Sequence, residues 1–543
     1  MENKVSANLV DVLNSKIYPA TIEIRGGRIA RIERDGGNYR TYILPGFVDS
    51  HIHIESSMLV PSEFARLAVA HGTVASVSDP HEIANVLGIE GVEYMIDNAK
   101  MVPFKFCFGA PSCVPATAFE TAGASIGLSE IEALFEAGRV GYLGEMMNFP
   151  GVIAGNAEVR AKIRLARSLA KPVDGHAPGL RGRALKTYVD AGITTDHETI
   201  EYDEGKEKIS FGMKLLIREG SSARNLDALC PLIEEYPEQC MLCSDDKHPD
   251  DLIKGHINLL VRKAVGKGID VMKVLRSACV NPVLHYRLDV GLLRIGDPAD
   301  FIEVDNLRNF NVIRTYVNGN VVAEEGKALL LRAPALRINN FRTGPKDVGD
   351  FAVGAKGKRI NVIEAINQEV ITGRTEVVPK LIKGCAVSDV ERDILKIAVV
   401  NRYADAPVAV GFVKNFGLKK GAIASSVAHD SHNIIAVGVD DKDLCDAVNL
   451  VIAEKGGLSV ADSDVREILP FPVAGLMSDQ DAYRVAKLYT GADKLAKEFG
   501  SGLDAPFMTL SFMALLVIPK LKLSDRGLFD SETFRFINLF KDE

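Results

Sequence analysis

The sequence predicts an α/β fold with a (β/α)8 TIM-like barrel, flanked by a small β-sandwich domain and followed by a C-terminal mixed α+β domain. Short apolar segments alternate with helical stretches through the first half of the chain, which is typical of a parallel barrel. Strand-like segments stand before and after this region, and tight turn signals such as Gly26-Gly27 join them.

The 543 residues are too many for one ordinary domain. A polar break around Asn339, Asn340 and Gly344 separates the last third of the chain, which mixes strands with helices such as Lys442–Glu454 and Asp479–Lys497. The expected segments are 1–45 and 285–335 for the two parts of the small β-domain, 46–284 for the barrel and 345–543 for the C-terminal domain.

Eight apolar runs are the candidate barrel strands, and helical stretches such as Ala157–Ala170 lie between most of them. The expected strands are Ile43–Val48, Thr73–Ser78, Phe104–Ala110, Gly141–Met147, Pro172–His176, Ile193–His197, Met213–Arg218 and Cys240–Ser244.

Composition narrows the class of protein. The formal net charge of −8 argues against nucleic acid as a main partner, because binding its backbone requires a basic surface. No apolar run reaches the roughly 18 residues that span a bilayer, and no signal peptide is visible. The eight cysteines show no disulfide framework. We therefore expect a cytoplasmic protein without a membrane or nucleic-acid partner.

Polar residues gather where the predicted barrel strands end, which is where barrel enzymes place their active sites. Residues two apart in an extended segment point the same way, so His51 and His53 can hold one ion together. A lone H-x-H or strand-end carboxylate is usually structural, but five such elements on the correct strands favour a metal site for zinc, manganese or iron(II). The expected ligands are His51, His53, Glu145, His176, His197 and Asp245, with Glu145 placed where a bridge between two ions is expected.

Five further residues are candidates for substrate binding. His81 follows the second strand and could line the pocket, while Arg218 and Ser221 lie where the seventh strand ends. His429 and His432 belong to a polar cluster that could be a plain turn, could reach the barrel mouth or could hold a further ion.

The order of these motifs resembles the amidohydrolase superfamily, including its opening Leu-Pro-Gly-Phe-Val-Asp-Ser-His-Ile-His at residues 44–53 and its return to the flanking β-domain at residues 291–300. Within that superfamily the sequence resembles the prokaryotic adenine deaminases. Many relatives with two metals bridge them with a carboxylated lysine on strand four; Glu145 stands there instead, which counts against the hydantoinase and dihydroorotase branches. The segments that carry the resemblance are Ser78–Val86, Gly144–Gly151, Asp174–Pro178, Leu242–Pro249 and Ala428–Asn433.

The resemblance implies hydrolysis of adenine to hypoxanthine and ammonia with two divalent metal ions, of manganese or iron(II), with zinc as a further candidate. It implies Asp245 as the proton shuttle, with Asp246 as the rival. The acid that protonates the purine ring stays open among Glu82, Glu145 and Glu198. We expect a homo-oligomer whose partner is the small-molecule substrate.

Two other classes of function compete with this interpretation. The first is a cyclic-amide or dipeptide amidohydrolase on the same scaffold. The second is a non-catalytic relative used as an assembly module, which is disfavoured because every expected ligand is present.

Overall fold

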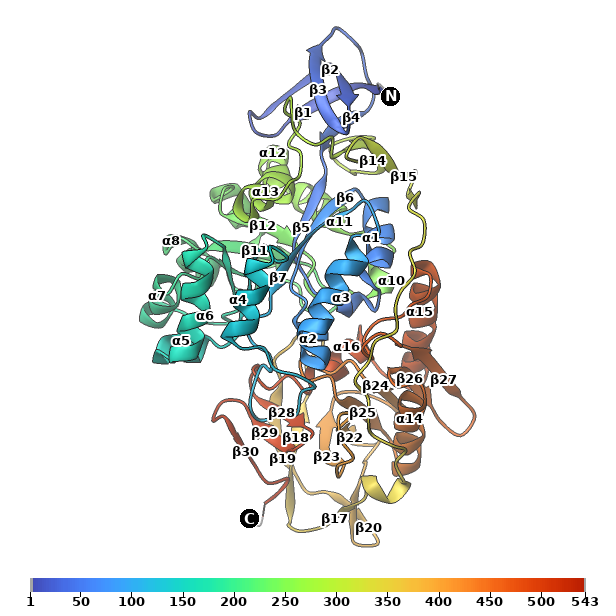
Figure 1. Ribbon diagram of the computed structural model, residues 1–543. Helices are drawn as coiled ribbons and strands as arrows, with labels where there is room; N and C mark the ends of the chain where they lie inside the picture. The colour runs from blue at the N-terminus through green and yellow to red at the C-terminus, as the bar shows by residue number, and fades with distance from the viewer. Residues whose placement is uncertain (1–2, 542–543) are drawn as a thin grey trace.

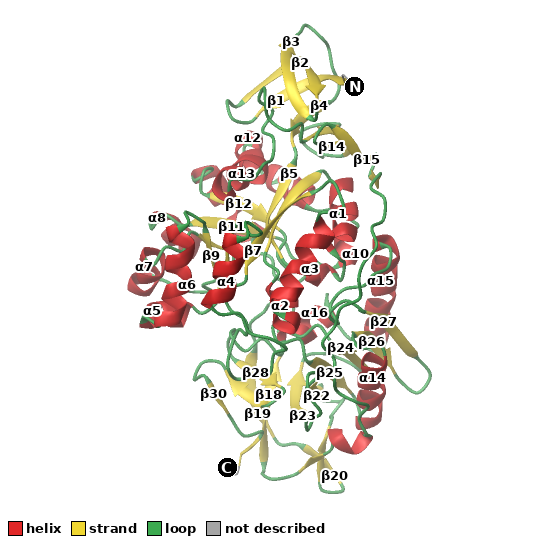
Figure 2. Ribbon diagram, viewed as in Figure 1, coloured by secondary structure: helices red, strands yellow, loops and turns green. Residues whose placement is uncertain are grey.

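Eight parallel strands separated by helices occupy the middle of the chain (Figures 1 and 2). The computed structural model describes residues 3–541. The strands form a five-stranded sheet in the order β5-β6-β7-β8-β9 and a three-stranded sheet in the order β10-β11-β12. Their bounds are β5 Phe47–Ile52, β6 Thr73–Ser78, β7 Lys105–Ala110, β8 Tyr142–Met146, β9 Val173–Gly175, β10 Thr195–Asp196, β11 Lys214–Arg218 and β12 Cys240–Cys243.

Helices follow most of these strands, as the alternation in the sequence predicts. The segment Ala157–Ala170 forms a helix over Ala157–Ser168, which Asn156 caps by accepting from the N–H groups of Glu158 and Val159. The helices of this region are α1 Pro61–Ala70, α2 His81–Leu87, α3 Ile89–Ala99, α4 Leu128–Glu136, α5 Phe149–Ala154, α6 Ala157–Ser168, α7 Gly182–Asp190, α8 Tyr202–Ser210, α9 Leu226–Glu235, α10 Pro249–Leu252, α11 Ile257–Gly266, α12 Val271–Leu275 and α13 Asn281–Tyr286.

The two parallel sheets meet at both edges. At one edge the Asp245 N–H donates to the His51 carbonyl over 2.9 Å, and Ile52 and Asp245 form a parallel bridge. At the other edge the Thr194 N–H donates to the Val173 carbonyl, also over 2.9 Å. All eight strands therefore bring their carboxyl ends to one side of the domain.

The first predicted strand, Ile43–Val48, is wrong in its bounds because the chain changes sheets at Gly46. Tyr42–Pro45 forms β4 of another sheet, and β5 starts at Phe47. A Cβ atom at Gly46 would lie 2.4 Å from the side chain of Val74, so only glycine fits this crossing. As a result, His51 lies inside β5 and His53 just beyond it.

Strands from both flanks of the parallel region share one eight-stranded sheet, in the order β16-β15-β14-β13-β4-β1-β2-β3. Gly26 and Gly27, with φ of 57° and 78°, form the predicted turn between β2 and β3. Whether this sheet folds into the layers of a sandwich, and where the domains begin and end, stay predictions. The strands are β1 Asn3–Asp11, β2 Lys16–Arg25, β3 Arg28–Arg34, β4 Tyr42–Pro45, β13 Phe301–Val304, β14 Val312–Val317, β15 Asn320–Glu324 and β16 Lys327–Ala328.

Residues 329–347 then run in irregular conformation along the outside of the parallel region to the C-terminal part of the chain (Figure 1). This part contains a nine-stranded sheet, and helices α14 (Asp441–Ala453) and α15 (Ala482–Glu498) form close to where we predicted them. The sheet consists of β18 Arg359–Glu364, β19 Gly373–Val377, β22 Ile394–Val400, β23 Ala409–Lys414, β24 Ala422–Ser425, β25 Ile434–Gly438, β26 Gly457–Ala461, β27 Arg466–Pro470 and β31 Phe540–Lys541.

The remaining elements are shorter. They are η1 Ile54–Ser57, η2 Arg276–Val280, η3 Val348–Phe351, α16 Pro506–Phe512, β17 Val353–Gly354, β20 Lys380–Ile382, β21 Cys385–Val387, β28 Leu521–Ser524, β29 Gly527–Asp530 and β30 Arg535–Phe536. Within residues 3–541 no helix is long and apolar enough to cross a membrane.

The C-terminal part contacts the loops at the carboxyl ends of the parallel strands. The Asn433 amide donates to the Thr121 carbonyl over 2.9 Å, and the Ser478 N–H donates to the Met58 carbonyl over 2.8 Å. On the outer side, the buried Glu63 carboxylate accepts from Arg332 over 3.1 Å and from the Ala482 N–H over 2.9 Å. The functional side chains at these strand ends are consequently enclosed between two parts of the chain.

Candidate active site

The six predicted metal ligands lie together at the carboxyl ends of the parallel strands, and all are buried. The two oxygens of Glu145 face different histidines. Oε1 is 3.1 Å from His53 Nε2, whereas Oε2 is 2.7 Å from His176 Nδ1 and 3.3 Å from His197 Nε2. Asp245 Oδ1 lies 3.4 Å from His53 Nε2 and 3.6 Å from His51 Nε2. Glu145 thus stands between two groups of ligands.

The donor atoms fit divalent metal ions. The sets His51–His53–Asp245 and His51–Glu145–His197 each bring three ligand atoms within 4.8 Å of one another. Neither ring nitrogen of His51, nor Nε2 of His176, has a hydrogen-bond partner among residues 3–541, although all three atoms are buried. Buried imidazole nitrogens without partners are costly unless a ligand occupies them, and nitrogen with carboxylate oxygen suits zinc, manganese or iron(II).

Asp79 contacts two of the predicted metal ligands, His53 and Glu145. Its backbone carbonyl lies 3.1 Å from Nδ1 of His53, which as the protonated nitrogen donates to it and leaves Nε2 free for an ion. Its Oδ2 accepts from the Glu145 N–H over 2.8 Å. We did not identify Asp79 from the sequence, although it directly follows β6 just as His197 directly follows β10.

Gly144 is the residue against which Asp79 packs, and a Cβ atom there would lie 2.3 Å from Asp79 Oδ2. Gly144→Ala is therefore expected to push Asp79 away, shift Glu145, and destabilise the fold by about 1–3 kcal/mol, as overpacking does. Metal content and the thermal unfolding midpoint measure the effect. Gly266→Ala is the matched control because nothing lies within 4 Å of the added carbon. Unchanged metal content in Gly144→Ala would contradict the role given to Asp79.

Arg218 connects the metal ligands to Glu198. It donates to both Glu198 oxygens over 2.7 and 2.9 Å and also to Asp245 Oδ2. Burial alone raises the pKa of the Asp245 carboxyl, but Arg218 and His53 lower that pKa well below its usual range. Asp246 differs, since burial and the charge of Asp245 raise its pKa, and it accepts from the Ser56 hydroxyl. These contacts favour Asp245 over Asp246 as a residue that would hold an ion together with His51 and His53.

Two histidines of the C-terminal part hold Glu82. His429 Nδ1 lies 2.6 Å from Glu82 Oε1, and His432 Nε2 contacts Oε2. These three residues also form a possible ion-binding group. However, the Ala428 N–H donates to His432 Nδ1 over 3.3 Å, which leaves the proton of a neutral His432 on Nε2, facing Glu82. Burial lowers the pKa of His429, but the charge of Glu82 raises it to about 9, so we favour an ion pair between Glu82 and His429 over a further metal at this position.

The catalytic cavity between the two parts of the chain is small, about 30 Å³. The predicted metal ligands other than His51 line this cavity, together with His81, Glu82, Arg218 and His429. These residues therefore lie in one place, while the role of each stays a prediction. Ser221 does not line it: the Ser221 hydroxyl donates to Asp251 over 2.8 Å and accepts from the His248 N–H, so its substrate-binding role stays a prediction. Lining residues that we did not identify from the sequence are Met147, Val370, Asp430, Phe512, Leu515 and Ile518.

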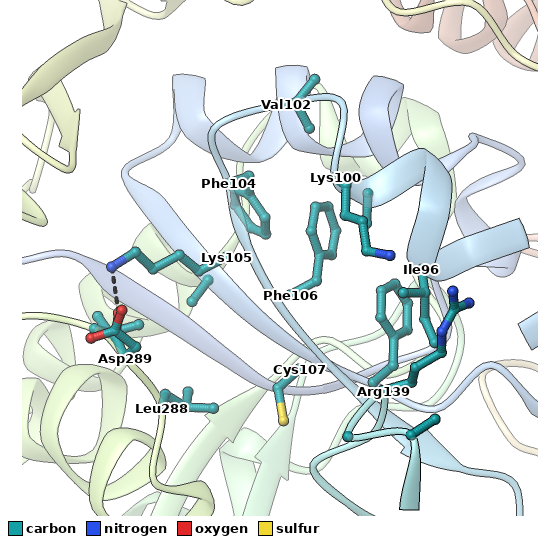
Figure 3. A pocket seen from close by; sticks show the side chains of 16 residues that line it. Ile96, Lys100, Val102, Phe104, Lys105, Phe106, Cys107, Arg139, Leu288 and Asp289 are labelled. Carbon is teal, nitrogen blue, oxygen red and sulfur yellow. Dashed lines mark hydrogen bonds between the residues drawn. The ribbon is translucent and has the colours of Figure 1, made fainter. Parts of the chain in front are cut away.

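A larger cavity of about 600 Å³, whose lining is drawn in Figure 3, shares no lining residue with the catalytic cavity. Phe104 and Phe106 form its apolar wall. Both lysines that line it are paired, since Lys105 lies 2.6 Å from Asp300 and Lys100 lies 2.8 Å from Asp97. It carries none of the metal-binding groups described above.

The parallel strands and the histidine–carboxylate cluster at their carboxyl ends define an amidohydrolase, and the amidohydrolase family matches residues 42–322. The family described as adenine deaminase C-terminal domain matches residues 369–535. An adenine deaminase of Sulfurovum sp. (strain NBC37-1) is 55% identical over 98% of this chain and 99% of its own. The adenine deaminase of Salinibacter ruber (strain DSM 13855 / M31) is 54% identical over 99% of both chains. The chain belongs to the adenine deaminase family.

Among solved structures, a β-aspartyl dipeptidase from Fervidobacterium islandicum AW-1 is 15% identical, with a TM-score of 0.47 over 61% of this chain and 100% of its own.

Proposed function

We propose that the chain hydrolyses adenine to hypoxanthine and ammonia with two divalent metal ions. The observation that carries this proposal is Glu145, whose two oxygens face two groups of histidines in the place where many relatives use a carboxylated lysine. The relatives named adenine deaminase, which align over almost the whole chain, support adenine as the substrate and disfavour a cyclic amide or dipeptide.

The parallel sheets support the finer fold that this function requires. We infer that they are two arcs of one closed (β/α)8 barrel, since hydrogen bonds join them at both edges. Such a barrel places every metal ligand on one face, where barrel enzymes carry out their chemistry.

The predicted ligands divide into two groups that have Glu145 in common. His51, His53 and Asp245 would hold one ion, His176 and His197 the other, with Glu145 shared between them. Two ions bound there would lower the pKa of water enough to provide a nucleophile near neutral pH. Manganese or iron(II) is the expected metal, and zinc suits the same donors.

The side chains around the ions supply the proton transfers. Replacing the amino group by a hydroxyl requires one proton to leave the water and one to reach the departing nitrogen. Asp245 would carry this proton, because Arg218 occupies its Oδ2 and leaves Oδ1 facing the histidines. Ammonia then leaves, and the ring keeps the oxygen of water.

Glu82 is the favoured group for passing a proton to the purine ring nitrogen. Burial raises the pKa of its carboxyl, but His429 and His432 lower that pKa well below its usual range, so Glu82 rests as a carboxylate. The source of the proton would be His429, since burial lowers the pKa of this histidine but the charge of Glu82 raises it to about 9. Glu198 is held by Arg218, which does not release a proton. His81 and His429 both line the cavity and lie beside Glu82 Oε1, at 3.7 and 2.6 Å, and they would contact the base.

The purified protein, loaded with manganese or iron(II), is expected to release ammonia from adenine with the ultraviolet change that marks hypoxanthine. Removing the metals with a chelator should abolish turnover, and adding them back should restore it, because the ions activate the water. Adenosine, guanine and cytosine are the control substrates. A metal-loaded protein that leaves adenine intact but opens dihydropyrimidines or hydantoins would overturn the proposal. The homo-oligomer and the cytoplasmic location stay predictions.

A further inference from the structure

The catalytic cavity is too small for the proposed substrate. Its volume of about 30 Å³ has room for a few water molecules only, whereas a purine has two fused rings. An outer cavity of about 390 Å³ lies beside it, a size that suits a small ligand. The two cavities share three lining residues, Glu198, Arg218 and Val370.

Two of these shared residues are fixed. Arg218 holds both oxygens of Glu198 and also contacts Asp245, so neither side chain can move without breaking a buried ion pair. Val370 is different, since it is an apolar, half-buried residue in the loop between β18 and β19. Of the three, Val370 is the residue whose side chain makes no ion pair, so that side chain can turn aside at the lowest cost.

We propose that Val370 is the gate through which the purine passes from the outer cavity to the metal site, and that Lys522 positions this gate. The inference rests on the proposed function, because it assumes that the metal site acts on a purine. The inference goes beyond that function because it assigns a route for the substrate and a role to each of Val370 and Lys522.

Lys522 is completely buried, and its amine joins two walls of the catalytic cavity. Nζ donates to the Val370 carbonyl over 2.8 Å and to the Phe512 carbonyl over 2.9 Å. Within residues 3–541 it has no carboxylate partner, and burial lowers its pKa to about 7. Both the charged and the neutral amine have the two N–H groups that these bonds need.

The loop is anchored at its ends and held by Lys522 near its middle. On one side Asn367 donates to Asp504 over 3.1 Å, and on the other the Thr372 N–H donates to the Pro519 carbonyl over 2.9 Å. In the part of the chain that the structure describes, Lys522 is the hydrogen-bond donor to the Val370 carbonyl. Loss of the amine is therefore expected to free the gate while the ends of the loop stay in place.

Reversible labelling of a cysteine at position 370 tests whether the purine passes there. Val370→Cys is loaded with metal, and the kcat/KM for adenine is measured before and after a bulky methanethiosulfonate reagent attaches to the new thiol, and again after dithiothreitol removes it. We expect kcat/KM to fall about tenfold or more and to recover, because the passage is closed and reopened. Complete labelling, verified by mass spectrometry, with unchanged kcat/KM overturns the proposal.

Two controls distinguish a failure of the gate proposal from a failure of the proposed function. Val353→Cys carries its thiol on half-buried β17, outside both cavities, and should keep its kcat/KM when labelled. The unsubstituted protein reports labelling at its half-buried Cys107 and Cys385. If it leaves adenine unchanged, the proposed function fails; if it is active and labelled Val370→Cys stays active, only the gate fails.

The role of Lys522 has its own readout. Lys522→Met, made together with Val370→Cys, should speed the reaction of that thiol with the reagent, because the loop is no longer held. The same substitution made with Val353→Cys should leave the labelling rate unchanged, which a general loss of structure would not. Equal labelling rates at Val370→Cys with and without Lys522→Met would overturn the positioning role.

Discussion

Glu145→Gln is expected to lower metal content and deamination of adenine steeply. The amide keeps the size of the side chain but offers one oxygen where the carboxylate offers two, and those oxygens face His53 on one side and His176 on the other. Since losing a mere supporting residue costs about 10–100-fold in affinity or activity, losing the shared ligand should cost more. Elemental analysis and the rate of ammonia release measure both effects.

The control for this substitution is Glu132→Gln, which makes the same chemical change on an exposed position of α4. It should retain both ions and normal turnover. Two ions per chain with near-normal turnover in Glu145→Gln would show that Glu145 does not connect them.

Asp245→Asn is expected to lower kcat by about 10²–10⁴-fold, the usual contribution of a positioned acid or base. An amide cannot accept the proton of water, although it can still pair with Arg218 and keep the loop after β12 in place. Circular dichroism and the unfolding midpoint should therefore stay near those of the unsubstituted protein, while single-turnover kinetics report the lost step.

Asp246→Asn decides between the two neighbouring carboxylates. Its side chain accepts from Ser56 and makes no ion pair with Arg218, so we expect a smaller loss of kcat than in Asp245→Asn. The reverse order, with Asp245→Asn near normal, would move the proton transfer to Asp246.

The strand ends explain why much of the site could be predicted from the sequence. The end of a barrel strand can be recognised in the sequence, and the carboxyl ends of all the strands lie on one face of the barrel. His176, His197 and Asp245 could therefore be assigned to one site before any contact was known. The first strand was misplaced because its break depends on Gly46 meeting Val74, a contact that no local pattern records.

The other half of the cavity could not be predicted in the same way. His429 and His432 were singled out as a polar cluster, but their pairing with Glu82 joins residues about 350 positions apart. Val370, Phe512 and Lys522 gave no signal, because an apolar residue or a lysine is ordinary in any domain. Their importance arises only from the packing of one part of the chain against the other.

Glu63 has a consequence for how this chain unfolds. Its carboxylate is buried on α1. It pairs with Arg66 from the same helix and with Arg332 from the irregular segment, and it accepts from the N–H of Ala482 at the start of α15. A chain that ended before residue 330 would lose Arg332 and Ala482, two of these three partners, together with the segments that carry them. We therefore expect the parts of the chain before and after residue 330 to stabilise each other and to melt in one cooperative transition, which calorimetry would detect as a single peak.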